Sequence, residues 1–438
     1  MSLMLDAAYL AVGLICLPWI AYRFARAGAR GDLPMRFGRR LGEPLERSIW
    51  LHGSSAGEVS LLKPLVAMLE RDFPGSPLVV SAFTDTGLAA ARRLYPRQRV
   101  VPLPFDLSFF VRRVLDRFDP RLVIIVESEF WPNLIAAARR RGVPVAVVNG
   151  KMSEKSFRFH ARTRLVPSVL KSLDLIAVQT EEHAARLRAL GVDEHVIRVT
   201  GNMKYDMTHA AVGAEEAQAL RCALELTPDD VVVIGGSVHE HEDEALLEAF
   251  KAVRARAPQA ALLIVPRYPG DAANVAANVR RFGYTPVLKS EVDAGAAAAP
   301  GRSGVLVVDT VGELGRLYAA ADVAFVGGSL FFRGANKGGH NLMEPAILGV
   351  PVLFGPYNFS FKETVQDLLA RDAGTLVRDA SELTAALERL CLDAELRRTL
   401  GARARAVVVD GQGATRRNYE LLTELLAEPA ERLRRATV

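Results

Sequence analysis

The sequence predicts an α/β protein with two doubly wound domains and an apolar segment before the first of them. Short apolar runs alternate with longer amphipathic runs, which is the pattern of parallel β-α-β units. The alternation occurs in two successive blocks, separated by a polar, weakly patterned stretch from Tyr205 to about Leu226. Half of the 438 residues are hydrophobic and 24% are charged, a composition that supports a packed core and argues against disorder.

Apolar runs in both blocks define the expected strands and domains. The first block has seven: Ser48–Ser54, Pro77–Phe83, Arg99–Phe105, Leu122–Ser128, Val143–Gly150, Asp174–Thr180 and Val196–Asn202. The second has five: Val231–Ser237, Ala261–Arg267, Val305–Thr310, Val323–Ser329 and Val350–Gly355. We expect Rossmann-like domains at residues 31–210 and 225–425. We expect ligands in a cleft between them, beyond the carboxyl ends of the strands.

The amino terminus carries an uncharged run, residues 7–22, followed by Arg23, Arg26 and Arg30. A cleaved signal peptide carries its positive charge before the apolar run, so this order argues against one. The run is marginal for a full span, which takes about 20 apolar residues. We expect residues 1–30 to form an N-terminal membrane-anchor helix with its basic flank on the cytoplasmic side. The alternative is an amphipathic first helix packed on the body.

Charge and cysteine content narrow the class of protein. The net charge of +5 favours phosphate-bearing partners and does not by itself identify nucleic acid. The three cysteines, Cys16, Cys222 and Cys391, form no C-x-x-C pair, so the sequence indicates neither a zinc site nor a disulfide framework. A reducing, cytoplasmic setting fits this usage.

The motif HGSSAGEVS places Glu58 in the first turn of a helix that we expect to begin near Ala56. The helix dipole favours an ionised carboxylate there, and such a carboxylate near a substrate hydroxyl can act as a general base. Ser55-x-x-Glu58 is also a capping box, which needs no chemistry. The local pattern by itself favours the capping interpretation.

A second acidic motif, VESEFWPNL, places Glu127 and Glu129 at a strand end, before Trp131 and Pro132. Proline suits the first turn of a helix. Carboxylates at this position of an α/β fold either serve a ligand or lie solvated in a loop, and the pattern leaves both interpretations open.

The segment VVVIGGSVHEHEDE contains a glycine turn that lets backbone N–H groups approach an anion. HEHED looks like a metal cluster. However, it lacks the P-C-x-x-C partner of the zinc deaminases, and Asp243 stands where H-E-x-x-H requires histidine. We therefore expect no metal site.

A glycine-rich stretch, VGGSLFFRGANKGGHNLMEP, carries Arg333 and Lys337 and ends in a short helix with Glu344. Glycines, two cations and a helix amino terminus together predict an anion cradle, and Glu344 could accept hydrogen bonds from ribose hydroxyls. The alternative is a mobile surface loop.

Several separated motifs, in order, resemble the 3-deoxy-D-manno-octulosonic acid (Kdo) transferases of lipopolysaccharide biosynthesis. They are HGSSAGEVS, VESEFWPNL, NGKMSEKSF, GNMKYD, GGSVHEHEDE, VPRYP, VGELGRLYAAADVAFVGGSL, GGHNLMEP and GPYNFSFKE. The resemblance covers nearly the whole chain. It implies a GT-B fold, a CMP-Kdo donor, a lipid A precursor as acceptor, inversion at the anomeric carbon, and no metal or cofactor. From the basic flank of the apolar run we expect the cytoplasmic side of the cell inner membrane as the location, and we expect no nucleic acid partner.

The resemblance also implies roles for particular residues. Glu58 takes the general-base position, and Glu127 and Lys204 fall where the family supports the transition state. The implied CMP-binding residues are Pro266, Arg267, Val311, Gly312, Glu313, Asn341, Leu342, Met343 and Glu344. Two departures concern geometry: Lys151 stands where the family often has arginine, and Leu342 stands where we expect proline.

The acceptor is expected to bind the amino-terminal block. Nine Lys or Arg residues and one acidic residue, Glu154, lie between Arg139 and Lys171. Such a stripe suits lipid phosphates and an anionic membrane, or it is a solvated basic face. Three aromatic residues could touch acyl chains or pack in the core: Phe105, Phe109 and Phe110.

Three other functions compete with Kdo transfer. One is a GT-B enzyme with a nucleotide-diphosphate sugar, or a related epimerase. Another is a catalytically silent, membrane-bound lipid-binding or nucleotide-binding protein, which the joint presence of Glu58, Lys204 and Glu344 argues against. A dehydrogenase is disfavoured because no G-x-G-x-x-G motif follows a predicted strand.

Overall fold

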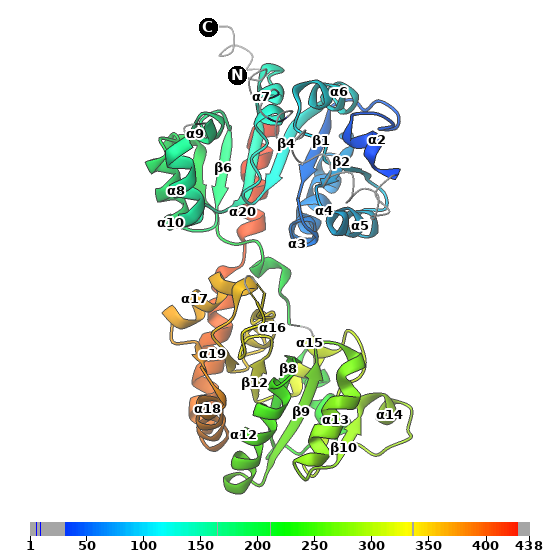
Figure 1. The fold of residues 1–438 in the computed structure, drawn as a ribbon, viewed down its shortest axis with the longest axis vertical. Coiled ribbons are helices and arrows are strands. Elements are labelled where there is room, and N and C mark those ends of the chain that lie inside the picture. Colours follow the sequence, from blue (N-terminus) through cyan, green and yellow to red (C-terminus); the bar gives the residue numbers. More distant parts are fainter. Residues whose placement is uncertain are drawn as a thin grey trace. The chain divides into compact units, whose positions relative to one another are not determined.

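The computed structural model describes residues 6, 9, 31–163, 165–210, 212–334 and 337–427. The chain divides into two compact units, the first formed by Met1–Met207 with Gln412–Val438 and the second by Thr208–Gly411. Each unit is a parallel seven-stranded sheet with helices on both of its faces (Figure 1).

The sheet of the first unit has the strand order β3-β2-β1-β4-β5-β6-β7. Its strands are β1 (Ser48–His52), β2 (Leu78–Ala82), β3 (Arg99–Pro102), β4 (Pro120–Val126), β5 (Val145–Gly150), β6 (Leu175–Val178) and β7 (Ile197–Val199). The helices are α2 (Leu33–Arg36), α3 (Ala56–Leu61), α4 (Lys63–Asp72), α5 (Asp85–Leu94), α6 (Ser108–Phe118), α7 (Pro132–Arg140), α8 (Glu154–Thr163), α9 (Leu165–Leu170), α10 (Glu181–Ala189) and α20 (Ala414–Ala427). Short 3₁₀ turns lie at Glu194–Val196 and Tyr205–Met207.

The sheet of the second unit has the order β10-β11-β9-β8-β12-β13-β14. Its strands are β8 (Val231–Val238), β9 (Ala260–Pro266), β10 (Pro286–Leu288), β11 (Val305–Val307), β12 (Val323–Val326), β13 (Val352–Phe354) and β14 (Gly374–Leu376). The helices are α11 (Ala214–Ala223), α12 (Glu242–Arg256), α13 (Ala272–Arg281), α14 (Lys289–Asp293), α15 (Leu314–Leu317), α16 (Met343–Ile347), α17 (Lys362–Ala370), α18 (Ala380–Leu392) and α19 (Ala394–Gly411). Short 3₁₀ turns lie at Pro269–Asp271, Tyr318–Ala320 and Phe359–Phe361.

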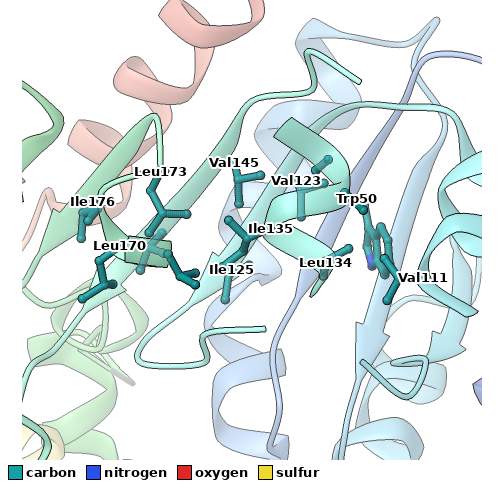
Figure 2. Packing of buried hydrophobic residues seen from close by; sticks show 14 of the residues in the cluster. Trp50, Val111, Val123, Ile125, Leu134, Ile135, Val145, Leu170, Leu173 and Ile176 are labelled. Carbon is teal, nitrogen blue, oxygen red and sulfur yellow. The ribbon is translucent and has the colours of Figure 1, made fainter. Parts of the chain in front are cut away.

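The first sheet is buried on both faces, which explains its continuous apolar strands. Alternate residues of β1 point to opposite sides: Trp50 joins one core cluster, while Ile49 and Leu51 join the other. Figure 2 shows Trp50 and its strand neighbours packed against Leu134 and Ile135 of α7. The Trp50 indole N–H donates to the Ser81 hydroxyl at 2.8 Å, so burial of this ring leaves no polar atom unsatisfied.

All the strands predicted from the sequence are present, mostly trimmed by one to a few residues at the ends. Two strands of the second sheet, β10 and β14, were not predicted. Each has three residues and is only partly buried. Neither therefore produces the continuous apolar run by which a buried strand is recognised in a sequence.

The predicted membrane anchor lies, apart from Asp6 and Tyr9, outside the described residues. Asp6 accepts hydrogen bonds from the Ser108 backbone N–H at 2.9 Å and from the Asn133 amide at 3.0 Å. Among the described helices, none is both long enough and apolar enough to span a bilayer.

The last helix belongs to the first unit, although the second domain was expected to extend to residue 425. Helix α20 packs on the first unit, and the preceding helix, α19, belongs to the second. The carboxylate of Asp206 holds the start of α20 by accepting from the backbone N–H groups of Gly413 and Thr415. Ala414, Tyr419 and Leu422 then pack in one core cluster of the first sheet. Chain order alone placed this helix in the second domain.

We expect Leu422→Ala to destabilise the first unit by about 2–5 kcal/mol, the usual cost of truncating a buried leucine. Leu422 has no exposed surface, whereas the neighbouring Glu424 is exposed and makes a matched control as Glu424→Ala. Thermal unfolding measures the loss of stability, and hydrogen exchange of the backbone amides of β4 and β5 shows whether this core is affected. Equal protection of these strands in the two variants would show that α20 is not part of this core.

Candidate functional site

In the first unit, the predicted site residue Glu58 lies just after the end of β1. Ser55 caps α3, and its hydroxyl contacts the Glu58 backbone N–H at 3.4 Å. The Glu58 carboxylate accepts from the Ser54 backbone N–H and from the Ser55 hydroxyl, each at 2.8 Å. Glu58 therefore takes part in the hydrogen bonds of the helix cap. The same bonds hold its carboxylate at the carboxyl edge of the sheet, where ligands of such folds bind.

Glu127 follows β4, the strand next to β1, and has a left-handed backbone with φ of 62°. Such a conformation is uncommon for a residue other than glycine and is found disproportionately at functional sites. The Glu127 carboxylate contacts Lys151 Nζ at 2.6 Å and Lys204 Nζ at 3.9 Å. Lys151 follows β5 and Lys204 follows β7, so the ends of separate strands bring these three charges together.

Burial shapes the acidity of this cluster. It raises the pKa of Glu58, and the negative charge of Glu127 raises it further, while the Ser54 and Ser55 hydrogen bonds and the Lys151 charge lower it. Burial and the charge of Glu58 likewise raise the pKa of Glu129. A carboxylate whose pKa is raised is a stronger base when ionised, which suits proton abstraction from a hydroxyl.

The second unit contains a pocket of about 380 Å³ lined by Ser237, Gly312, His340, Asn341 and Glu344, among others. The Asn341 side chain donates to Glu344 Oε1 at 3.1 Å and accepts from the Met343 backbone N–H at 3.1 Å. Burial raises the pKa of Glu344, with the Asn341 hydrogen bond opposing that effect. Three of the predicted nucleotide-binding residues, Gly312, Asn341 and Glu344, thus line one cavity.

Other predicted nucleotide-site residues are placed differently. The side chains of Leu342 and Met343 are buried in the protein, so only their backbone is left for a ligand, and Pro266 is buried at the end of β9. Val311 is 83% exposed. The Glu313 carboxylate accepts a hydrogen bond from the Thr310 hydroxyl, and its Oε1 lies 3.4 Å from Lys289 Nζ.

Two histidines meet at the carboxyl edge of the second sheet. His239 follows β8, and His340 lies in the loop before α16. Their Nε2 atoms are 2.8 Å apart, and their ring centroids are 5.1 Å apart with an interplanar angle of 11°. Both rings lie against Gly328, where a Cβ would come within 2.9 Å of His340 and 3.1 Å of His239. Gly328 also has φ of 71°, so this position requires glycine.

Burial, together with the charges of Arg333 and Arg267, lowers the pKa of His239 to about 3 and that of His340 to about 4. The His239 ring is further flanked by Tyr268 at 6.0 Å between centroids, and Arg267 lies over the same tyrosine ring. Both histidines are neutral at pH 7, and one Nε2 donates to the other.

Glu242, in the HEHED segment, is buried and holds the loop after β12 to the end of β8. Its carboxylate accepts from the backbone N–H groups of His239, Gly328, Ser329 and Leu330 at 2.6–3.0 Å. Within the described part of the chain, no cluster of three or more His, Cys, Asp or Glu side chains could hold a metal ion. The Glu242 carboxylate of the HEHED motif is therefore bound to the backbone of this loop.

Comparison with known proteins identifies the family. A sequence model of the family described as 3-Deoxy-D-manno-octulosonic-acid transferase (kdotransferase) matches residues 32–207. The 3-deoxy-D-manno-octulosonic acid transferase of Bordetella pertussis is 36% identical over 93% of this chain and 95% of its own length. That of Haemophilus influenzae is 29% identical over 95% and 98%. This chain belongs to the Kdo transferase family. The family and enzyme class predicted from the motifs are confirmed.

The fold of this Kdo transferase also has more distant relatives. MurG of Acinetobacter baumannii superimposes with a TM-score of 0.53 at 14% identity over 86% of this chain and 99% of its own. The UDP-GlcNAc 2-epimerase of Neisseria meningitidis gives 0.54 at 13% identity over 87% and 100%. At these identities the likeness concerns the fold alone, and it confirms the predicted GT-B architecture.

Sequence reasoning missed His239, His340 and the role of Glu242 in this Kdo transferase. One signal could have found His239: it directly follows the central strand of its sheet, as Glu127 follows β4. No signal in the sequence pairs His239 with His340, because 101 positions separate them.

We expect Glu242→Gln to lower the free energy of unfolding of the second unit by about 1.5–3 kcal/mol, since the amide nitrogen cannot accept and leaves backbone N–H groups without a partner. Glu240→Gln is the matched control, because Glu240 is exposed two positions away. Denaturant unfolding of both variants measures the difference. If the two variants were equally stable, the bonds to Glu242 would not hold this loop.

Proposed function

We propose that this Kdo transferase moves Kdo from CMP-Kdo to a hydroxyl of a lipid A precursor (lipid IVA), with inversion at the anomeric carbon. The observation that carries the proposal is the placement of Glu58 beside the Glu127–Lys151 pair at the carboxyl ends of β1, β4 and β5. Two carboxylates and one ammonium group thus lie at adjacent strand ends, which supports a role in proton transfer from an acceptor hydroxyl.

In the proposed reaction, Glu58 removes the proton from the acceptor hydroxyl. The hydroxyl oxygen then forms a bond to the anomeric carbon on the face opposite CMP, and the bond from that carbon to the phosphate oxygen breaks. CMP leaves with the electron pair. Lys204 and the Glu127–Lys151 pair provide fixed charges near the base that need no reorganisation during the reaction.

We assign the nucleotide to the second unit. The pocket lined by Gly312, Asn341 and Glu344 has a glycine with φ of 90°, where no side chain blocks a ligand, and a carboxylate for ribose hydroxyls. The leaving group is a nucleoside monophosphate, which carries less negative charge than a departing nucleoside diphosphate. Arginine side chains can therefore stabilise it without a metal ion.

The acceptor carries phosphates and acyl chains, and we assign it to the first unit. Helix α8 lies within the basic stripe from Arg139 to Lys171 and buries none of its residues. Phe109 is 57% exposed under Arg113, whereas Phe105 and Phe110 pack on Phe37. The exposed basic helix α8 and the exposed Phe109 of α6 each support binding of an anionic lipid by this unit.

We expect Glu58→Gln to reduce turnover at least about 10²-fold, because glutamine cannot accept the hydroxyl proton. Stability changes by less than about 1 kcal/mol, since glutamine still completes a capping box. Product mass after incubation with CMP-Kdo and lipid IVA, together with the melting temperature, measures both effects. Wild-type activity requires ionised Glu58, so it falls as the pH drops through a pKa above the ordinary glutamate value.

Ser55→Ala is the matched control for this experiment. It removes the cap hydroxyl, costs about 0.5–2 kcal/mol of stability, and retains the base. Near-normal turnover in Glu58→Gln would return this residue to capping alone. Formation of no Kdo-bearing lipid by the wild-type protein would refute the proposed acceptor.

We further propose that residues 1–30 attach the enzyme to the cytoplasmic side of the inner membrane. The support is the uncharged run followed by Arg23, Arg26 and Arg30. We expect truncation after Arg30 to move much of the protein into the soluble fraction at high salt, where surface charges no longer hold it. Identical fractionation of the truncated and full-length chains would exclude this segment as the anchor.

A further inference from the structure

Two aromatic side chains of the first unit lie at the same edge of the sheet as the carboxylates and take no part in the proposed proton transfer. Phe83 directly follows β2, and Trp131 lies in the loop between β4 and α7. Their ring centroids are 5.2 Å apart, with an interplanar angle of 41°. Because β2, β1 and β4 are neighbours in the sheet, these residues share its carboxyl edge with Glu58 and Glu127.

Backbone hydrogen bonds tie Phe83 to the proposed base. The Phe83 N–H donates to the Ser54 carbonyl at 3.2 Å, and the Ser54 N–H donates to the Glu58 carboxylate at 2.8 Å. Because Ser54 bonds to both residues, the backbone of Phe83 is fixed relative to this carboxylate. A molecule seated on the Phe83 ring is thereby held near the group that would take its proton.

The Trp131 ring is held from the core side. It meets the His52 ring edge to face, with centroids 6.1 Å apart and an interplanar angle of 77°. His52 ends β1 and is fully buried, and its Nδ1 lies 3.0 Å from the Ser81 hydroxyl. Pro132, which begins α7, restricts the backbone of Trp131. The indole is therefore oriented before any ligand binds.

Part of this aromatic pair remains exposed. Phe83 is 40% exposed, although the Arg36 guanidinium carbon lies 5.5 Å from its ring centroid. Trp131 packs only partly on the core, and its Nε1 atom is buried, so the ring offers only carbon to a ligand. A preorganised apolar surface beside a few polar groups is the usual composition of a ligand site.

The charges of this edge indicate which part of a ligand the pair takes. The faces of aromatic rings carry partial negative charge and disfavour anions. Lys151 and Lys204 follow β5 and β7, whereas Phe83 follows β2, on the other side of β1. The carboxylate of Kdo is therefore expected near the lysines, and the aromatic pair is left for the acceptor.

An acyl chain fits this surface less well than a sugar ring does. A chain would cover the neighbouring Glu58 carboxylate without offering it a hydrogen bond, which costs free energy. A sugar ring presents C–H groups on one face and hydroxyl groups at its edge. Its C–H face can pack on Phe83 and Trp131 while a hydroxyl donates to Glu58.

We propose that Phe83 and Trp131 form a platform for the C–H face of the acceptor sugar that carries the reacting hydroxyl. The contact positions that hydroxyl for Glu58 and selects a sugar as the acceptor. This inference rests on the proposed function, because it takes Glu58 as the base and the first unit as the acceptor domain.

The test measures KM for lipid IVA and KM for CMP-Kdo with the full-length protein. We expect Phe83→Leu, which keeps the apolar volume and loses the flat ring, to raise KM for lipid IVA about three- to tenfold, as for loss of an aromatic contact. KM for CMP-Kdo stays unchanged, and Phe83→Tyr, which keeps the ring, recovers most of the affinity. Trp131→Leu raises the same KM, and its melting temperature checks that it folds; Phe83→Leu carries the test if it does not.

Phe73→Leu is the matched control. Phe73 is likewise a partly exposed phenylalanine beside an arginine, Arg121, but it lies between α4 and β2, at the amino edge of the sheet. Its substitution leaves both KM values as in the wild type. Equal KM values for lipid IVA in Phe83→Leu and Phe73→Leu would overturn the proposal.

Binding of deacylated lipid IVA, followed by saturation-transfer NMR, separates the sugar from the acyl chains. We expect the wild-type protein to bind this ligand and Phe83→Leu to bind it more weakly, by the same factor as KM for lipid IVA rises. Equal binding by the two proteins, with a raised KM for lipid IVA, would overturn the proposal in favour of an acyl chain on the platform. A raised KM for CMP-Kdo with an unchanged KM for lipid IVA would overturn it in favour of the Kdo ring.

A wild-type protein that forms no Kdo-bearing lipid would refute the proposed acceptor, and with it this inference. Failure of the inference alone appears only in the variants of an active enzyme. The two failures are therefore distinguishable.

Discussion

A carboxylate removed from water must be surrounded by hydrogen-bond donors or positive charge, and this requirement organises both halves of the molecule. In the second unit, Glu242 meets it with four backbone N–H groups, which fasten the loop after β12 to the end of β8. The fastened loop contains Gly328, where a Cβ would come within 2.9 Å of His340 and 3.1 Å of His239. One buried charge thus determines where the polar groups of that edge lie.

Buried carboxylates of the first unit also have donors or positive charge beside them, but from different groups. Glu58 uses the donors of the helix cap, and Glu127 uses lysines that follow β5 and β7. The Ser54 and Ser55 hydrogen bonds and the Lys151 charge do not cancel the effect of burial on Glu58, so the pKa of Glu58 stays raised. The arrangement leaves a carboxylate that is fixed in place and basic, which is what proton abstraction from a hydroxyl requires.

Local sequence signals were reliable where one segment contains the whole interaction. The Ser55 cap of the helix that contains Glu58 and the helix start at Pro132 are formed as predicted, because their partners lie within four residues. The anion cradle was predicted from glycines, two cations and a helix amino terminus, and it stays a prediction. The local pattern gave no sign that Glu242, 86 positions earlier than Gly328, accepts from the Gly328 backbone N–H.

The sequence by itself determined the two parallel sheets, the acidic strand ends and the family. Apolar runs and their spacing reflect burial on both faces of a sheet, which each segment records locally. Only the tertiary structure decided the partner of His239, the Lys151–Glu127 pair and the return of α20 to the first unit. These contacts join positions far apart in the chain. They depend on which strands become neighbours, and no single segment encodes that.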